Sequence, residues 1–173
     1  MGLDFLILAI QTLGATLTTY SLINLMGIGI DLLYIVRYLL NPKVRQRRRE
    51  VKRFIYGAIE DRISLILKIL GINNTYNSNI GTPKVFLNLR EADRPGGRYF
   101  WGHYLITLDV PKKLKDILPV LDHELVHYVQ DVLNVVGPRW YLEGMASCVE
   151  LKLHGKSRGY VKELHKFMKL VSP

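Results

Sequence analysis

Two histidines and a glutamate form the group in this sequence best suited to bind a metal ion and do chemistry. Residues 123–127 read HELVH, so His123 and His127 are four residues apart. On a helix that spacing puts both side chains on one face, where their imidazoles can bind one ion. Glu124 projects beside them, where its carboxylate can take a proton from a metal-bound water without being a ligand. The pattern predicts a metal-dependent hydrolytic site.

A third ligand is expected on the next helix. Catalytic zinc sites have three protein ligands and one open position. Glu143 follows His127 after fifteen intervening residues, and the Gly137-Pro138 break between them lets the second helix turn back on the first. We therefore expect Glu143 to complete a site for one Zn²⁺ per chain. Ser147 and Glu150 lie on the same helical face as Glu143, as residues that orient the histidines would.

The two motifs together resemble a known family. HExxH followed by a helix bearing WxxEGxA is similar to the gluzincin zinc metallopeptidases, and the small size resembles the archaeal minigluzincins and the catalytic domains of integral-membrane metallopeptidases. The resemblance covers roughly residues 54–155. It implies endopeptidase-like hydrolysis of a peptide or protein, with zinc on His123, His127 and Glu143 and with Glu124 as general base and acid.

The resemblance also implies a substrate strand and an oxyanion-stabilising side chain. The strand that pairs with an extended peptide would fall within residues 104–108, namely Tyr104, Leu105, Ile106, Thr107 and Leu108. The oxyanion would be stabilised by a Tyr or His near the metal, for which Tyr141 and His154 are candidates beside His103 and Tyr160. Trp101 is expected in the core, and so is Tyr104 where it does not serve the substrate.

The elements that must position these residues indicate an α+β fold, and the resemblance implies that it is a small zincin-like catalytic domain. Apolar residues recur at helical spacing over 44–70, and short alternating segments predict an antiparallel sheet. Asp116 is the expected N-cap of the active-site helix, which we expect to run to about Val136. The expected order is a helix over 44–70, strands over 84–89 and 99–110, the active-site helix, the glutamate helix over 139–154 and a last helix over 158–170.

The N-terminal 40 residues differ from the rest in composition. Residues 5–30 contain no charge, and 41–53 hold seven basic residues and one acidic residue. This predicts a membrane anchor over 1–40, a basic juxtamembrane linker over 41–53 that contacts anionic lipid, and a catalytic domain over 54–173 on the cytoplasmic side. The alternative is a soluble cytoplasmic protein in which 1–40 forms helices packed on the body or on a second copy.

Composition excludes some classes of function and leaves others open. With 49% hydrophobic residues the chain is not a disordered protein, and Cys148 as the single cysteine excludes an intramolecular disulfide and a cysteine-based zinc site. The net charge of +9 comes from two basic segments, 41–53 and 154–173, while residues 54–153 are neutral, so a nucleic-acid partner is not expected. Two alternatives remain. One is a latent or inactive metal-binding scaffold with the basic tail over the cleft, and the other is a membrane or nucleic-acid adaptor with an accidental HExxH.

Overall fold

The computed structural model describes residues 35–36, 40–72, 80–157 and 159–171. The chain divides into two compact units, residues 1–45 and 46–173, of which the second contains the sheet and the metal-ligand candidates. Almost all of the predicted anchor over 1–40 lies outside the described residues. Among those described, no helix is both long enough and apolar enough to cross a membrane.

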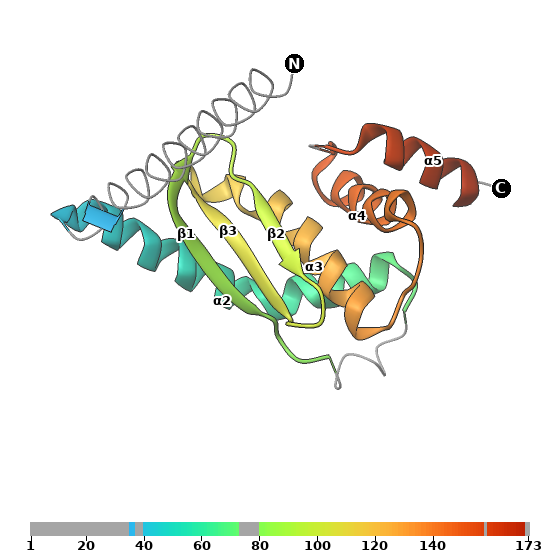
Figure 1. The fold of residues 1–173 in the computed structure, drawn as a ribbon, viewed down its shortest axis with the longest axis horizontal. Coiled ribbons are helices and arrows are strands. Elements are labelled where there is room, and N and C mark those ends of the chain that lie inside the picture. The colour runs from blue at the N-terminus through green and yellow to red at the C-terminus, as the bar shows by residue number, and fades with distance from the viewer. Residues whose placement is uncertain (1–34, 37–39, 73–79, 158, 172–173) are drawn as a thin grey trace, which may run out of the picture. The chain divides into compact units, whose positions relative to one another are not determined.

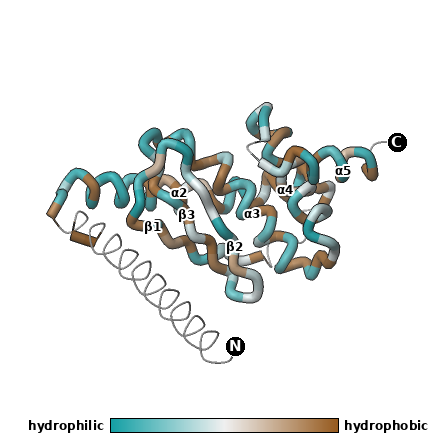
Figure 2. Tube along the Cα trace, turned by 45° about the horizontal axis from the view of Figure 1, so that its top comes forward, coloured by the Kyte–Doolittle hydropathy of each residue, from teal (hydrophilic) through white to brown (hydrophobic). Residues whose placement is uncertain are grey.

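The first described long helix, α2, spans Pro42–Ile69. Asn41 precedes it, and its side-chain oxygen accepts a hydrogen bond from the main-chain N–H of Lys43 at 3.0 Å, as an N-cap residue does. One face of the helix is apolar and is buried in the core through Val51, Ile55, Ile59, Ile63, Ile66 and Leu67. The alternation of hydrophobic and hydrophilic positions along this helix is visible in Figure 2. Most of the basic run over 41–53, predicted as a juxtamembrane linker, forms the first turns of α2.

The sheet has three strands, β1 (Lys84–Ala92), β2 (Gly97–Phe100) and β3 (Leu105–Pro111), in the order β1-β3-β2. β2 and β3 form an antiparallel hairpin, whereas β1 runs parallel to β3. The prediction of an antiparallel sheet is thus wrong for one of the two pairs. The chain reverses direction twice between β1 and β3, so these two strands point the same way and the sheet is mixed.

Three further helices follow, α3 (Leu118–Val132), α4 (Arg139–His154) and α5 (Val161–Val171). α3 begins after a single 3₁₀ turn, η2 (Leu114–Asp116), so Asp116 is not its N-cap, and it ends four residues before the predicted Val136. α2 and α3 cover the same face of the sheet (Figure 1), and the core lies between these helices and the strands. The result is an α+β fold in which α3 and α4 carry the predicted ligands.

Candidate metal centre

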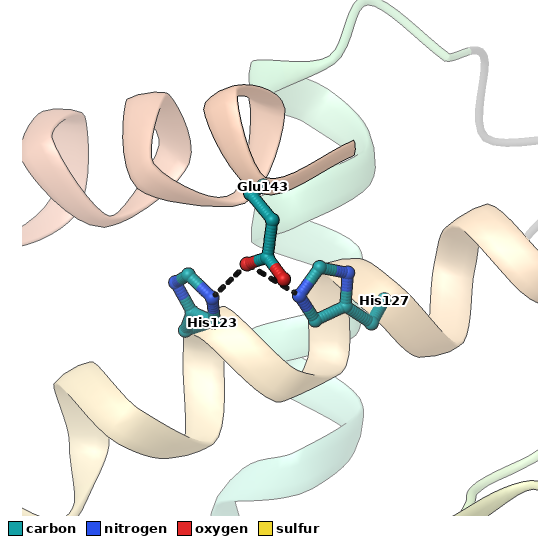
Figure 3. A group of neighbouring side chains, drawn as sticks. All are labelled: His123, His127 and Glu143. Atoms are coloured by element: carbon teal, nitrogen blue, oxygen red, sulfur yellow. Dashed lines mark hydrogen bonds and ion pairs between the residues drawn. The ribbon is translucent and has the colours of Figure 1, made fainter. Parts of the chain in front are cut away.

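The three predicted ligands converge in the structure. His123 and His127 project from α3, and Glu143 projects from α4 between them (Figure 3). The Glu143 Oε2 atom lies 3.3 Å from His123 Nε2 and 3.4 Å from His127 Nε2. One ligand atom from each residue lies within 4.8 Å of the other two.

These separations fit a tetrahedral zinc site. With metal–ligand distances of about 2.0–2.1 Å, two ligand atoms of a tetrahedron are about 3.4 Å apart. The two nitrogen–oxygen distances agree with that value. Two imidazoles and one carboxylate are also a donor set that catalytic zinc sites use, with one position left open. The residues present therefore fit a zinc ion.

The outer nitrogens of both histidines have partners. His127 Nδ1 lies 2.8 Å from Gln130 Oε1, and His123 Nδ1 lies 3.6 Å from Glu150 Oε2. Gln130 also donates from Nε2 to the carbonyl of Leu142 at 3.0 Å, so its amide oxygen must face His127. An acceptor at Nδ1 holds the proton there and leaves Nε2 free to bind a metal.

Of these partners, Glu150 was predicted and Gln130 was not. Gln130 is fully buried, and it follows His127 by three positions on the same helix. This three-residue spacing is the sequence feature that could have predicted the contact with His127, because side chains three residues apart on a helix lie close together. Ser147 was predicted beside Glu150 and is fully buried, but its hydroxyl has no hydrogen-bond partner among the described residues.

The charges of the ligands depend on one another. Burial alone would lower the pKa of His123, but the hydrogen bonds with Glu143 and Glu150 and the charge of Glu124 outweigh burial and raise that pKa to about 9. Burial alone would raise the pKa of Glu143, but the hydrogen bonds with His123 and His127 lower it to about 2. In the absence of metal the site is thus an ion pair between a protonated His123 and an ionised Glu143. A metal ion must displace the proton of His123.

Glu124 lies next to this group on α3 and is 7% exposed. Burial raises the pKa of its carboxyl, and the charges of both histidines together with a hydrogen bond from the main-chain N–H of Tyr99 only partly offset that. A Cβ atom on Gly97 would lie 2.8 Å from the Glu124 Cγ atom. β2 therefore lies so close to this side chain that a residue larger than glycine at position 97 would clash with it. A carboxylate with a raised pKa at this place suits a proton carrier.

The site opens into a cleft of about 760 Å³. Its walls come from β2 and the segment before it, from the turn after β2, from α3, from α4 and from the segment before α5. Trp101, predicted in the core, is 43% exposed and lines this cleft, and Tyr104, which does not line it, is 50% exposed. Both lie in the turn between β2 and β3.

The predicted substrate strand is not the edge strand. Residues 105–108 lie in β3, and each of them pairs with β1 on one side and with β2 on the other. A strand paired on both sides has no main-chain groups left for a peptide. The edge at the cleft belongs to β2, while two main-chain carbonyls of the other edge strand, β1, accept hydrogen bonds from Arg48.

Of the residues considered for stabilising the oxyanion, neither Tyr141 nor His154 lines the cleft. Tyr141 packs on Phe167 with ring centroids 5.4 Å apart, and His154 donates from Nε2 to the buried carboxylate of Asp122 at 2.6 Å. Tyr160, the other tyrosine considered, does line it and stacks on the ring of His123 at 5.7 Å with 17° between the planes. This tyrosine comes from the segment before α5, so its position could not be read from spacing relative to the motif.

The C-terminal segment does not close the cleft in the described part of the chain. Among residues 155–157 and 159–171, only Gly159 and Tyr160 line it. α5 packs on α4 instead, through Leu164 and Phe167 against the buried thiol of Cys148.

Comparisons of the chain with protein-family models, with curated proteins and with solved structures found no match. The interpretation of the site therefore depends on its own geometry.

Proposed function

We propose that this protein is a zinc-dependent endopeptidase of the gluzincin type. The observation that carries the proposal is the convergence of two histidine Nε2 atoms and a carboxylate oxygen at the spacing of a tetrahedral zinc site, beside a buried glutamate and in an open cleft. A zinc ion held by His123, His127 and Glu143 would act as a Lewis acid, polarising the peptide carbonyl and lowering the pKa of water.

Glu124 would be the proton carrier. It would accept a proton from the attacking water and then deliver it to the nitrogen of the leaving amine. The main-chain N–H of Tyr99 donates to its carboxylate and fixes the direction of the side chain. The raised pKa that burial produces lets the carboxyl hold the proton between the two steps.

The free edge of β2 would bind the peptide. Asp109 donates its main-chain N–H to the carbonyl of Gly96 at 2.9 Å, and main-chain groups in an antiparallel pair alternate between the partner strand and the other side. The N–H and carbonyl of Gly97 and the carbonyl of Tyr99 therefore point away from β3. These groups would pair with the peptide, because the Tyr99 N–H already donates to Glu124. An extended peptide added at this edge would pass directly over Glu124.

Tyr160 and Arg139 would stabilise the negative charge that develops on the carbonyl oxygen. The Arg139 guanidinium hydrogen-bonds the Tyr160 side chain and lies 5.8 Å from its ring. Both residues line the cleft next to His123 and Glu143. Donors at such a position stabilise the charge that develops in the transition state.

The decisive variant is Glu124→Gln, which keeps the volume of the side chain and removes the base. We expect kcat/KM on a mixture of fluorescence-quenched peptides to fall by about 100-fold or more, while the zinc content stays that of the wild type. Hydrolysis by the variant at the wild-type rate would refute the role of Glu124.

A further inference from the structure

Trp101 is a large apolar side chain that lines the cleft. Its ring lies 6.1 Å from the ring of the ligand candidate His127, and 43% of the residue is exposed. An exposed tryptophan in contact with a metal-ligand candidate offers a flat apolar surface to whatever enters the cleft.

Hydrogen bonds and a ring contact in and next to the turn after β2 hold Trp101 in this position. The Asp131 carboxylate on α3 accepts a hydrogen bond from the Tyr99 hydroxyl at 2.6 Å and another from the main-chain N–H of Gly102 at 2.7 Å. The Trp101 ring packs edge-on against the Tyr99 ring at 5.7 Å. One carboxylate thus anchors the residues on both sides of Trp101, and its ring faces the cleft instead of folding back into the core.

The direction of β2 says which part of a peptide would meet this ring. β2 runs from Gly97, next to Glu124, towards Phe100, and Trp101 follows. Antiparallel addition at a sheet edge is the more stable and more frequent arrangement. A peptide paired in that way runs opposite to β2, so the residues before its cleaved bond lie at the Trp101 end.

We propose that Trp101 forms a subsite for a large apolar side chain, aromatic or aliphatic, of the peptide residues on the amino-terminal side of the cleaved bond. This proposal rests on the proposed function and adds the substrate class. Burying an aromatic or large aliphatic side chain against the ring favours binding by roughly 10- to 100-fold over a small or charged one.

Cleavage specificity tests the proposal, with Trp140 as the matched control. Trp140 is the only other tryptophan; it does not line the cleft and contacts Tyr141 and Lys166 instead. Wild-type protein, Trp101→Ala and Trp140→Ala are each incubated with unfolded casein, and the cleavage sites are identified by mass spectrometry. We expect Trp101→Ala to lose the preference for apolar residues before the cleaved bond by about tenfold or more, with the preference after the bond unchanged. Retention of the full preference by Trp101→Ala, or its equal loss in Trp140→Ala, would overturn the proposal.

A fluorescence titration tests the subsite without any hydrolysis. In the full-length double variant Glu124→Gln/Trp140→Phe, Trp101 is the only tryptophan. Acetylated hexapeptides of glycine with one Phe or one Asp are added to the zinc-loaded protein. We expect the Phe peptide to shift Trp101 emission to shorter wavelength at roughly a tenth or less of the concentration that the Asp peptide needs. Equal responses to the two peptides would overturn the subsite even if the wild type cleaves peptides. A selective response in the variant, together with no peptide cleavage by the wild type, would refute only the proposed activity.

Discussion

Gln130 offers a test of how the chain holds the proposed metal ligands. Its side chain is fully buried and makes two different contacts: the Oε1 atom accepts from His127 Nδ1 at 2.8 Å, and the Nε2 atom donates to the Leu142 carbonyl of α4 at 3.0 Å. The first contact fixes the protonation of a ligand. The second fixes the start of the helix that supplies Glu143. Gln130→Met, which is similar in volume and has no amide, removes both.

The magnitudes follow from those two contacts. Loss of an outer-sphere partner of a metal-binding histidine lowers metal affinity by about 10- to 100-fold. Leaving the buried Leu142 carbonyl without a donor lowers the free energy of unfolding by about 1–3 kcal/mol. Gln130→Glu separates the effects, because a carboxylate still accepts from His127 but cannot donate to Leu142. We therefore expect Gln130→Glu to keep most of the zinc affinity and to lose stability.

The assay is a competition titration of zinc between the protein and a chromophoric chelator, together with urea unfolding of the metal-free protein. Wild type, Gln130→Met and Gln130→Glu are compared at one pH and one ionic strength. A folded Gln130→Met variant with the zinc affinity of the wild type would refute the assigned role. So would a loss of zinc affinity in Gln130→Glu as large as in Gln130→Met.

Three further predictions concern stability. Gly144→Ala should lower the free energy of unfolding by about 1–3 kcal/mol in urea denaturation, because the added Cβ would lie 2.7 Å from a main-chain oxygen of α5. As the control, Gly57→Ala in helix α2, where a Cβ would have nothing within 4 Å, should raise the free energy of unfolding by about 0.5–1 kcal/mol. Arg62→Met should cost about 3 kcal/mol or more by leaving the fully buried Asp122 without its guanidinium partner, so a thermal midpoint equal to that of the wild type would contradict this pairing. The folded-state pKa of His123, about 9, exceeds its ordinary value of 6.5, so protonation of this group stabilises the metal-free protein fully below pH 6.5. That stabilisation is lost as the pH rises to 9. Urea unfolding with a chelator present should show the free energy of unfolding falling over this pH range, and His123→Asn should abolish the fall.

The parts of the site that could be predicted from the sequence are those that depend on one helix. His123 and His127 share a face because of their spacing, and Glu124 follows from its place between them. The prediction of Glu143 depended on a second helix turning back at Gly137-Pro138, a pair of residues that marks a helix end and a new start in the sequence. In the structure the Glu143 carboxylate lies against both histidines.

The parts that could not be predicted depend on packing between distant segments. The order of the strands, which makes β2 and not β3 the edge at the cleft, depends on how β1 pairs with β3. The approach of Tyr160 to His123 depends on the position of α5 against α4, which Gly144 allows because α5 lies where a side chain would be. Trp101 was expected inside because large aromatic residues usually are, and only the anchoring by Asp131 explains its position at the cleft.

Zinc stoichiometry tests the central claim most directly. The metal-free full-length chain is titrated with zinc, and bound metal is measured for the wild type, for Glu143→Ala and for Glu124→Gln. We predict one tightly bound zinc per chain in the wild type and in Glu124→Gln, and a strongly weakened site in Glu143→Ala, because Glu143 supplies one of three ligands whereas Glu124 supplies none. A wild-type chain that binds no zinc, or a Glu143→Ala variant that binds it as tightly as the wild type, would contradict the proposed metal centre.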